Sequence, residues 1–304
     1  MKQYDIVIVG AGPAGLTAAI YACRAAKKVL VLEVKSYGGQ IINTPDVENY
    51  PAFDHISGFD FATKLYEQAE NLGAEIEFER VKNIEDRGNE KIVKTDENNY
   101  ACTAVILAKG SENRRLGLDN EEALVGRGVS YCATCDGAFY KGKKVAVNGG
   151  GNTALEDALY LSNLADMVYL IHRRDEFRGQ EATVKQLKEK QNVKFILNSK
   201  ISKLNAGKKL ESIEVKDKNG KVEKIEVDGL FVAIGRRPEN EGLIKLLKLD
   251  DAGYVVAGED CHTNILGVFV AGDSRAKEVR QLVTATSDGA IAAEEAIKYI
   301  NERK

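Results

Sequence analysis

The sequence predicts an α/β protein with two Rossmann-like dinucleotide-binding domains, the second inserted in the first. A strand, a glycine-rich turn, a helix and a second strand follow one another twice in the 304 residues. The chain after residue 235 adds one strand and a long helix but no third glycine-rich turn, so we expect it to return and complete the first domain. The predicted domains are residues 1–113 with 242–304, and residues 114–241.

The first copy, "YDIVIVGAGPAGLTAAIYACRAAKKVLVLE", starts with a nearly continuous apolar run, as expected of a buried parallel strand. Gly10 then allows a tight turn, Gly12 lets the backbone approach a pyrophosphate, and Gly15 lets the helix pack on the strand. The helix is predicted from Pro13 to Ala26, with its free N–H groups facing the phosphates. Glu33, 18 residues after Gly15, is placed to accept hydrogen bonds from a ribose.

The second copy is "KKVAVNGGGNTALEDALYLSNLADMVYLIHRRDEFR", with a helix predicted over residues 152–164. Gly149, Gly151 and Ala154 stand at the three turn positions. When Gly10 is placed on Gly149, a shift of 139 positions, Glu33 falls on His172. The two copies therefore present different side chains to the ribose.

Three arginines follow His172: Arg173, Arg174 and, one helical turn on, Arg178. A carboxylate suits a free 2′-hydroxyl group, whereas a guanidinium group suits a 2′-phosphate. The first copy is therefore expected to hold an unphosphorylated adenosine ribose, as in FAD or NAD. The second copy is expected to hold NADP(H).

The composition excludes several other classes of protein. Apolar residues make up 44% of the chain, and the net charge is −3, so neither a nucleic-acid nor a membrane footprint is predicted. No apolar run approaches the ~18–20 residues of a membrane span. The N-terminus enters a strand at once, without the apolar core of a signal peptide. We therefore expect a cytoplasmic protein.

The stretch "YCATCDG" places Cys132 and Cys135 two residues apart, just ahead of the second copy. Zinc would need four ligands, but the sequence has no second Cys-x-x-C, and its three histidines are scattered, so no metal site is predicted. A redox-active pair is favoured. Three cysteines stand alone and are interpreted as inert thiols: Cys23, Cys102 and Cys261.

Over essentially its whole length, the chain resembles the low-molecular-weight flavoprotein thioredoxin reductases. The resemblance rests on "GAGPAG", "GGQ", "VENYP", "GRGVSYCATCDG", "GGGNTALEDA", "HRRDEFR", "FVAIG", "GVFVAGD" and "RQLVTA". It implies FAD in the discontinuous domain and NADPH in the inserted one. The positions that match FAD contacts are Gly10, Gly12, Pro13, Ala14, Glu33, Gly39, Gln40, Asn49, Gly110, Asp273, Arg280, Gln281 and Leu282. Those that match NADPH contacts are Gly151, Asn152, Thr153, Glu156, His172, Arg173, Arg174 and Arg178.

The resemblance also implies the reaction: electrons pass from NADPH to FAD, then to the Cys132–Cys135 disulfide, then to oxidised thioredoxin. It implies that Cys135 faces the flavin, that Cys132 attacks thioredoxin and that the enzyme is a homodimer. Asp136, next to the pair, is predicted to move protons to and from a thiolate, with a turn aspartate as the alternative.

Three places depart from the family pattern: Lys109, Asn148 and the segment "GRRPEN" that begins at Gly235. Asn148 falls in a strand that we expect to be buried on both faces, where its amide needs a hydrogen-bond partner. Three other functions compete with NADPH-dependent thioredoxin reduction. The first is a related flavin disulfide reductase that takes electrons from ferredoxin instead of NADPH. The second is a flavin oxidoreductase that passes electrons to ferredoxin or a quinone, and the third is a redox-sensing binding protein without turnover.

Overall fold

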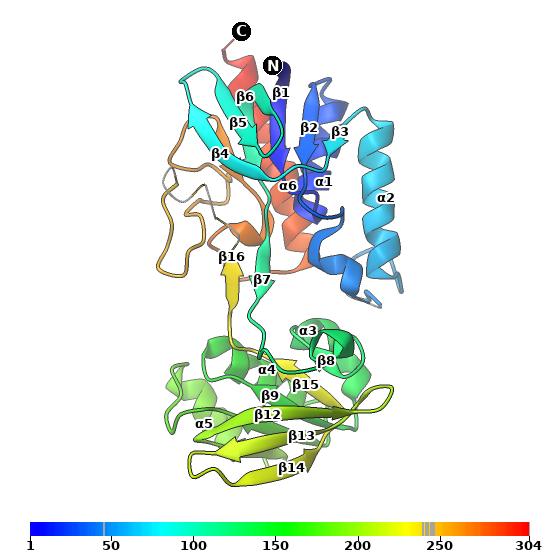
Figure 1. Ribbon diagram of the computed structural model, residues 1–304, viewed down its shortest axis with the longest axis vertical. Coiled ribbons are helices and arrows are strands. Elements are labelled where there is room, and N and C mark those ends of the chain that lie inside the picture. The colour runs from blue at the N-terminus through cyan, green and yellow to red at the C-terminus, as the bar shows by residue number, and fades with distance from the viewer. Residues whose placement is uncertain (45, 239, 241–242, 244–246, 304) are drawn as a thin grey trace. The chain divides into compact units, whose positions relative to one another are not determined.

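The computed structural model describes residues 1–303 except 45, 239, 241, 242 and 244–246 (Figure 1). The chain divides into two compact units, Met1–Glu112 with Arg237–Lys304 and Asn113–Arg236. The segments that cross between them, β7 (Ser111–Asn113) and β16 (Arg236–Pro238), pair as a two-stranded sheet. The predicted fold class, with one unit inserted in the other, is confirmed. The predicted boundary at residues 241–242, and residue 239 of "GRRPEN", lie outside the described residues.

The first unit is built on a seven-stranded sheet with the order β3-β2-β1-β6-β5-β4. Strand β17 pairs with the last part of β6, and β5 with its first part. The strands nearest the glycine turn run parallel, while β4 and β5 form an antiparallel extension. The strands are β1 (Lys2–Val9), β2 (Val29–Leu32), β3 (Glu75–Glu77), β4 (Val81–Asp86), β5 (Lys91–Thr95), β6 (Asn99–Leu107) and β17 (Val268–Val270).

Alternate residues of β1 face two separate cores. Ile6 and Ile8 pack with helices α1 (Pro13–Arg24) and α6 (Leu282–Asn301), which lie against each other on one face of the sheet. Val7 and Val9 pack on the opposite face with residues of β4–β6. The period-2 alternation of a strand explains why this continuous apolar run is buried on both sides. Helix α2 (Gly58–Asn71) and the short helices η1 (Gly39–Asn43) and η4 (Gly272–Ser274) complete the unit.

The second unit has a five-stranded parallel sheet with the order β11-β10-β9-β15-β8 and a separate antiparallel sheet β12-β13-β14. Helices α4 (Asn152–Ser162) and α5 (Glu181–Glu189), with the short α3 (Ala133–Asp136), η2 (Glu122–Leu124) and η3 (Gly137–Tyr140), are its helical elements. Its strands are β8 (Val129–Ser130), β9 (Lys144–Asn148), β10 (Met167–Ile171), β11 (Val193–Ile196), β12 (Ser199–Ala206), β13 (Leu210–Asp217), β14 (Val222–Glu226) and β15 (Gly229–Val232).

Three local predictions need adjustment. Helix α4 ends at Ser162 rather than at residue 164, because the Asn163 and Leu164 N–H groups donate to carbonyl groups three residues back, those of Tyr160 and Leu161. Helix α1 ends at Arg24 rather than at Ala26, because Ala26 adopts a φ of 54° and the Lys27 N–H closes the turn on the Ala22 carbonyl group. Asn148 is half-buried, and its amide makes no hydrogen bond within the described part of the chain. The expectation that its strand is buried on both faces at this position was therefore wrong, and water can serve the amide.

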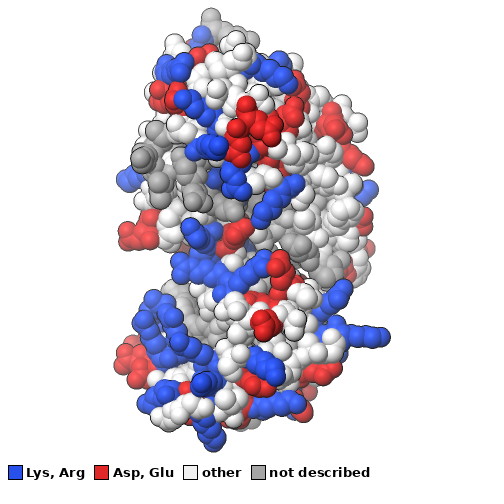
Figure 2. Space-filling model, in the orientation of Figure 1, with Lys and Arg blue, Asp and Glu red and all other residues white. Residues whose placement is uncertain are grey.

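The surface carries charges of both signs. On the face drawn in Figure 2, lysine and arginine side chains are accompanied by aspartate and glutamate, in keeping with the net charge of −3. Among the described residues, no helix has the length and apolar character that crossing a lipid bilayer requires.

Candidate active site

The first glycine turn fits a pyrophosphate. Gly10 has a φ of 111°, and a Cβ atom there would lie 2.4 Å from the Ala108 carbonyl oxygen. A Cβ on Gly15 would lie 1.8 Å from the Gly10 carbonyl oxygen. A Cβ on Gly12, in contrast, would meet nothing nearer than the Gly39 Cα at 3.9 Å. Gly10 and Gly15 thus close the turn, while Gly12 leaves open space above the helix.

Helix α1 begins at Pro13 with Gly12 as its N-cap, and no side chain caps its first N–H groups. The Glu33 carboxylate lies beside this turn, where one oxygen accepts from the Ala11 N–H (2.9 Å) and the other from the Val34 N–H (2.6 Å). An uncapped helix N-terminus binds anions, and a fixed carboxylate accepts from ribose hydroxyl groups. These residues therefore fit a dinucleotide whose adenosine ribose carries no 2′-phosphate.

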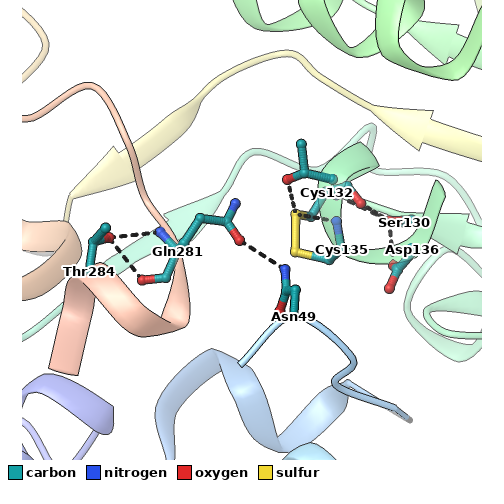
Figure 3. The surroundings of a disulfide bond; sticks show 8 residues. Asn49, Ser130, Cys132, Cys135, Asp136, Gln281 and Thr284 are labelled. Carbon is teal, nitrogen blue, oxygen red and sulfur yellow. Dashed lines mark hydrogen bonds between the residues drawn. A yellow bond between two sulfur atoms is a disulfide. The ribbon is translucent and has the colours of Figure 1, made fainter. Parts of the chain in front are cut away.

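The C-terminal segment joins this site because α6 approaches α1 closely. A Cβ on Gly289 would lie 2.2 Å from the Ala14 carbonyl oxygen. The Gln281 side chain caps α6 and accepts a hydrogen bond from the Asn49 amide, at 3.3 Å (Figure 3). The structure thus brings together Asn49 and Gln281, which the sequence analysis placed in one site although they are 232 positions apart.

Other predicted flavin contacts lie on the same unit. Ser274 donates to the Gly110 carbonyl oxygen at 3.3 Å, which places the Asp273 turn near Gly110. The Arg280 guanidinium group stacks on the Tyr254 ring at 4.0 Å, and its buried Nε has no partner within the described residues. Such a donor fits a polar group of a bound cofactor. Gln40 is exposed, and Leu282 begins α6.

The second glycine turn repeats the first. A Cβ on Gly149 would lie 2.2 Å from the Ala233 carbonyl oxygen, whereas one on Gly151 would meet no atom within 4 Å. Helix α4 begins at Asn152 with no side-chain cap, and Asn152, Thr153 and Glu156 are exposed. This turn therefore also fits a phosphate group.

His172 holds the basic loop against this turn. Its ring is buried and stacks on the Phe177 ring. The ring also packs closely on Gly150, where a Cβ atom would lie only 2.1 Å from the His172 Cε1. The ring Nε2 lies 3.1 Å from the Glu176 carbonyl oxygen, and the Arg178 N–H donates to the Gly150 carbonyl oxygen at 2.7 Å. Burial lowers the pKa of His172, with the neighbouring arginines acting in the same direction. His172 thus acts as a neutral support for the loop.

The three arginines are available for an anionic ligand. Arg173, Arg174 and Arg178 are exposed, and no guanidinium group of the three makes an ion pair with any described residue. This arrangement fits a 2′-phosphate.

Cys132 and Cys135 form a disulfide in the same unit, with Cα atoms 5.3 Å apart (Figure 3). Strand β8 leads directly into this turn, and α3 carries Cys135. The Cys135 N–H donates to the Cys132 sulfur at 3.2 Å, and the Thr134 hydroxyl lies 3.4 Å from that sulfur. Both cysteines are half-buried. The remaining three are reduced, and burial raises the pKa of Cys102 and of Cys261 to about 12, which makes them inert thiols.

Comparison with known proteins agrees with these observations. Residues 4–289 match the family model for pyridine nucleotide-disulphide oxidoreductases. Thioredoxin reductases of Listeria innocua and Bacillus subtilis are 43% and 40% identical, over 100% and 99% of this chain and 96% of each relative. The chain belongs to the thioredoxin reductase family. The crystal structure of thioredoxin reductase from Streptococcus pyogenes superposes with a TM-score of 0.95 at 38% identity, covering 99% of both chains.

This membership makes the protein an oxidoreductase of a family that uses a flavin and a pyridine nucleotide. This chain has a glycine turn with an uncapped helix N-terminus for each of the two cofactors, and a disulfide that two electrons can reduce. One solved relative, a ferredoxin-flavin thioredoxin reductase of Clostridium acetobutylicum, has 32% identity and a TM-score of 0.55 over 99% of both chains.

Asp136 is the acid nearest the disulfide in sequence, and its environment suits proton transfer. Burial raises the pKa of the Asp136 carboxyl group, while a hydrogen bond from Ser130, at 2.6 Å, opposes that rise. The titratable neighbour of Asp136 is the Tyr140 phenol. Burial and the charge of Asp136 raise the pKa of this phenol to about 12. An ordinary turn aspartate would be exposed, so the half-buried position of Asp136 favours the acid–base role.

Sequence reasoning missed Ser130. The residue lies two positions before Cys132, but no spacing rule distinguishes it from any other serine at the end of a strand. Its hydroxyl is recognised only through its contacts in the fold.

The described residues contain one group that could hold a metal ion, outside both cofactor turns: Asp46, Glu48 and His55. The His55 Nδ1 lies 2.9 Å from the Asp46 carboxylate and 3.4 Å from that of Glu48. The hydrogen bond that His55 donates to the Asp46 carboxylate raises the pKa of His55. The three side chains lie at the surface and contact one another as ion pairs, so their arrangement is accounted for without a metal ion.

Proposed function

We propose that this chain is an NADPH-dependent, FAD-containing thioredoxin-disulfide reductase. The observation that carries the proposal is the Cys132–Cys135 disulfide within the unit that also bears the free arginine cluster. A protein disulfide substrate and a 2′-phosphorylated nucleotide are the two reactants that these features recognise. The names of the relatives support thioredoxin as the disulfide partner.

The cofactors are assigned by charge. Glu33 at the first turn favours the free ribose of FAD in the discontinuous unit. Arg173, Arg174 and Arg178 at the second turn favour NADPH in the inserted unit, which spans residues 113–236 where the sequence predicted 114–241. When bound, the flavin and the nicotinamide would supply the two electrons that reduce the disulfide. The protein's own contribution is binding, orientation and proton transfer.

The surroundings of the Cys132 sulfur suit a thiolate. The Cys132 sulfur lies within reach of the Cys135 N–H and the Thr134 hydroxyl, and both can stabilise a thiolate. The Cys132 thiolate would attack one sulfur of oxidised thioredoxin, forming a mixed disulfide and releasing the other sulfur as a thiolate. Cys135 would then attack the Cys132 sulfur and release reduced thioredoxin. This order agrees with the roles that the family resemblance implies.

Asp136 would accept the proton that Cys135 loses when it attacks, and return it to the departing thiolate. A carboxyl group whose pKa is raised by burial can exist in either protonation state closer to neutral pH than an exposed aspartate. A homodimer and a cytoplasmic location are part of the same proposal, on family grounds alone.

A second candidate electron donor is ferredoxin, because the Clostridium acetobutylicum relative carries ferredoxin in its name. The exposed arginine cluster argues for NADPH, since a ferredoxin-dependent enzyme needs no site for a 2′-phosphate. Direct comparison of the two donors with the same purified protein decides between them.

The experiment measures thioredoxin reduction by the flavin-loaded protein with NADPH, NADH or reduced ferredoxin as the donor. We expect turnover with NADPH and loss of turnover in both Cys132→Ser and Cys135→Ser, with NADPH oxidation by an artificial acceptor retained. Cys23→Ser, which changes a half-buried cysteine of α1, is the matched control and should keep full activity. Turnover with ferredoxin alone, or with either active-pair variant, would overturn the proposal.

A further inference from the structure

The Ser130 hydroxyl connects the two chemical parts of the cysteine turn. It donates to the Asp136 Oδ2 at 2.6 Å and accepts from the Cys132 N–H at 3.1 Å (Figure 3). Ser130 is 4% exposed, so water does not readily replace these contacts. Its position is set by the parallel pairing of β8 with β15, in which Ser130 lies opposite Phe231.

A third contact lets the hydroxyl respond to the protonation of Asp136. The Cys132 carbonyl oxygen lies 3.3 Å from the Ser130 Oγ and is a second possible acceptor for the hydroxyl proton. A serine hydroxyl has one proton and two acceptor lone pairs. While Asp136 is ionised, the proton points to the carboxylate, because that hydrogen bond is charge-assisted and shorter.

When Asp136 binds a proton, its O–H group can donate to the Ser130 oxygen. The Ser130 proton can then turn to the Cys132 carbonyl oxygen, while the Cys132 N–H remains bound to the other lone pair. The Ser130 hydroxyl, the Asp136 Oδ2 and the Cys132 N–H thus keep a partner in both states. A side chain without a hydroxyl group leaves the Asp136 carboxyl group unpartnered in its ionised state.

We propose that Ser130 is a positioning residue that holds the Asp136 carboxyl group against the cysteine turn in both of its protonation states. This inference rests on the proposed function for its significance, because the acid–base role belongs to the disulfide exchange. Ser130 acts through its contacts with Asp136 and the Cys132 backbone.

Few other groups influence Asp136. The phenol of Tyr140 on η3 is the titratable group coupled to it, and α4, which packs against α3, carries Glu156 and Asp157. The pKa of Asp136 responds to burial, which raises it, and to the Ser130 hydrogen bond, which lowers it. Removing the hydroxyl therefore moves the pKa of Asp136 further upward.

The test is the rate of alkylation of the reduced cysteine pair by iodoacetamide, measured against pH in the flavin-loaded protein. The inflection that disappears in Asp136→Asn belongs to Asp136. In Ser130→Ala we expect that inflection about one to two pH units higher than in the wild type, the shift expected for a lost hydrogen bond to a charged group. Ser130→Thr retains the hydroxyl and should keep the wild-type inflection. Ser162→Ala is the matched control, because the Ser162 hydroxyl is also buried in this unit but donates only to the Leu159 carbonyl oxygen.

Coincident profiles of Ser130→Ala and the wild type would refute the inference, as would an upward shift in Ser130→Thr equal to that in Ser130→Ala. If Ser130→Ala does not fold, as judged by circular dichroism, Ser130→Thr decides alone: an unchanged inflection supports the inference and a raised one overturns it. Alkylation does not require thioredoxin. Absence of thioredoxin turnover in the wild type would therefore overturn the proposed function while leaving this measurement interpretable.

Discussion

Asp288 on α6 forms a buried ionic cluster that should stabilise the discontinuous unit. Its carboxylate accepts from the Arg275 guanidinium group at 3.1 and 3.2 Å, from the Lys277 ammonium group at 2.8 Å and from the Gly272 N–H at 3.0 Å. The side chains of Arg275, Asp288 and Lys277 are only 3%, 4% and 7% exposed. Two buried cations thus share one buried carboxylate, and Arg275 has a second, exposed partner in Glu259 at 3.3 Å. The cluster holds the segment that follows Asp273.

Asp288→Asn keeps the shape of the side chain but removes its charge. Breaking a buried ion pair by removing one partner costs about 3–5 kcal/mol, because the other charge stays buried without compensation. For a unit of this size, each kcal/mol lowers the melting temperature by about 2–4 °C, so we expect a decrease of about 6–20 °C. The flavin should also be retained less firmly, because Gly272 and the segment of Arg280 lose their anchor.

Calorimetric melting of the flavin-free protein, with flavin retention measured by gel filtration, tests this prediction. Glu294→Gln makes the same charge change on the exposed side of α6 and should alter stability by less than about 0.5 kcal/mol. Adding Lys277→Met to Asp288→Asn should recover part of the loss, since one uncompensated cation is removed. Equal melting temperatures for Asp288→Asn and Glu294→Gln would show that the cluster gives no net stabilisation.

Two further predictions concern the inserted unit. Arg174→Ala should lower kcat/KM for NADPH about tenfold or more while leaving NADH almost unchanged, because a charge-assisted hydrogen bond to a 2′-phosphate is worth about 1.5–3 kcal/mol; equal losses for both nucleotides would mean that Arg174 does not read the phosphate. Burial and Glu156 raise the pKa of Asp157 to about 7, so the native state binds a proton that the unfolded state releases between about pH 4 and pH 7, and native stability falls as the pH rises through this window. Asp157→Asn should therefore be more stable than the wild type by on the order of 3 kcal/mol at about pH 8, and this advantage should be absent below about pH 4, as chemical denaturation at both pH values can verify; an advantage that does not depend on pH would contradict the raised pKa.

The two glycine turns could be predicted from the sequence because each depends on residues that are close along the chain. Gly10 and Gly149 stand where a strand must turn at once into a helix, and any Cβ there meets the carbonyl oxygen of the residue that follows a neighbouring strand. The contrast between Glu33 and His172 was likewise visible, since both follow their turns at the same interval. Periodicity and local backbone geometry carry this information without knowledge of the fold.

The side-chain contacts around these turns were decided only by the tertiary structure. Asn49 meets Gln281, and Asp288 meets Arg275 and Lys277, because helix α6 packs against α1 at a particular depth and rotation. The role inferred for Ser130 depends on the register of β8 against β15. Such contacts arise from packing between segments far apart in sequence, where a change of one residue in register turns every side chain to the opposite face. The sequence by itself thus predicted a flavin, a pyridine nucleotide and one redox-active cysteine pair, whereas the hydrogen-bond and ion-pair partners of the buried acids follow from how the strands and helices pack.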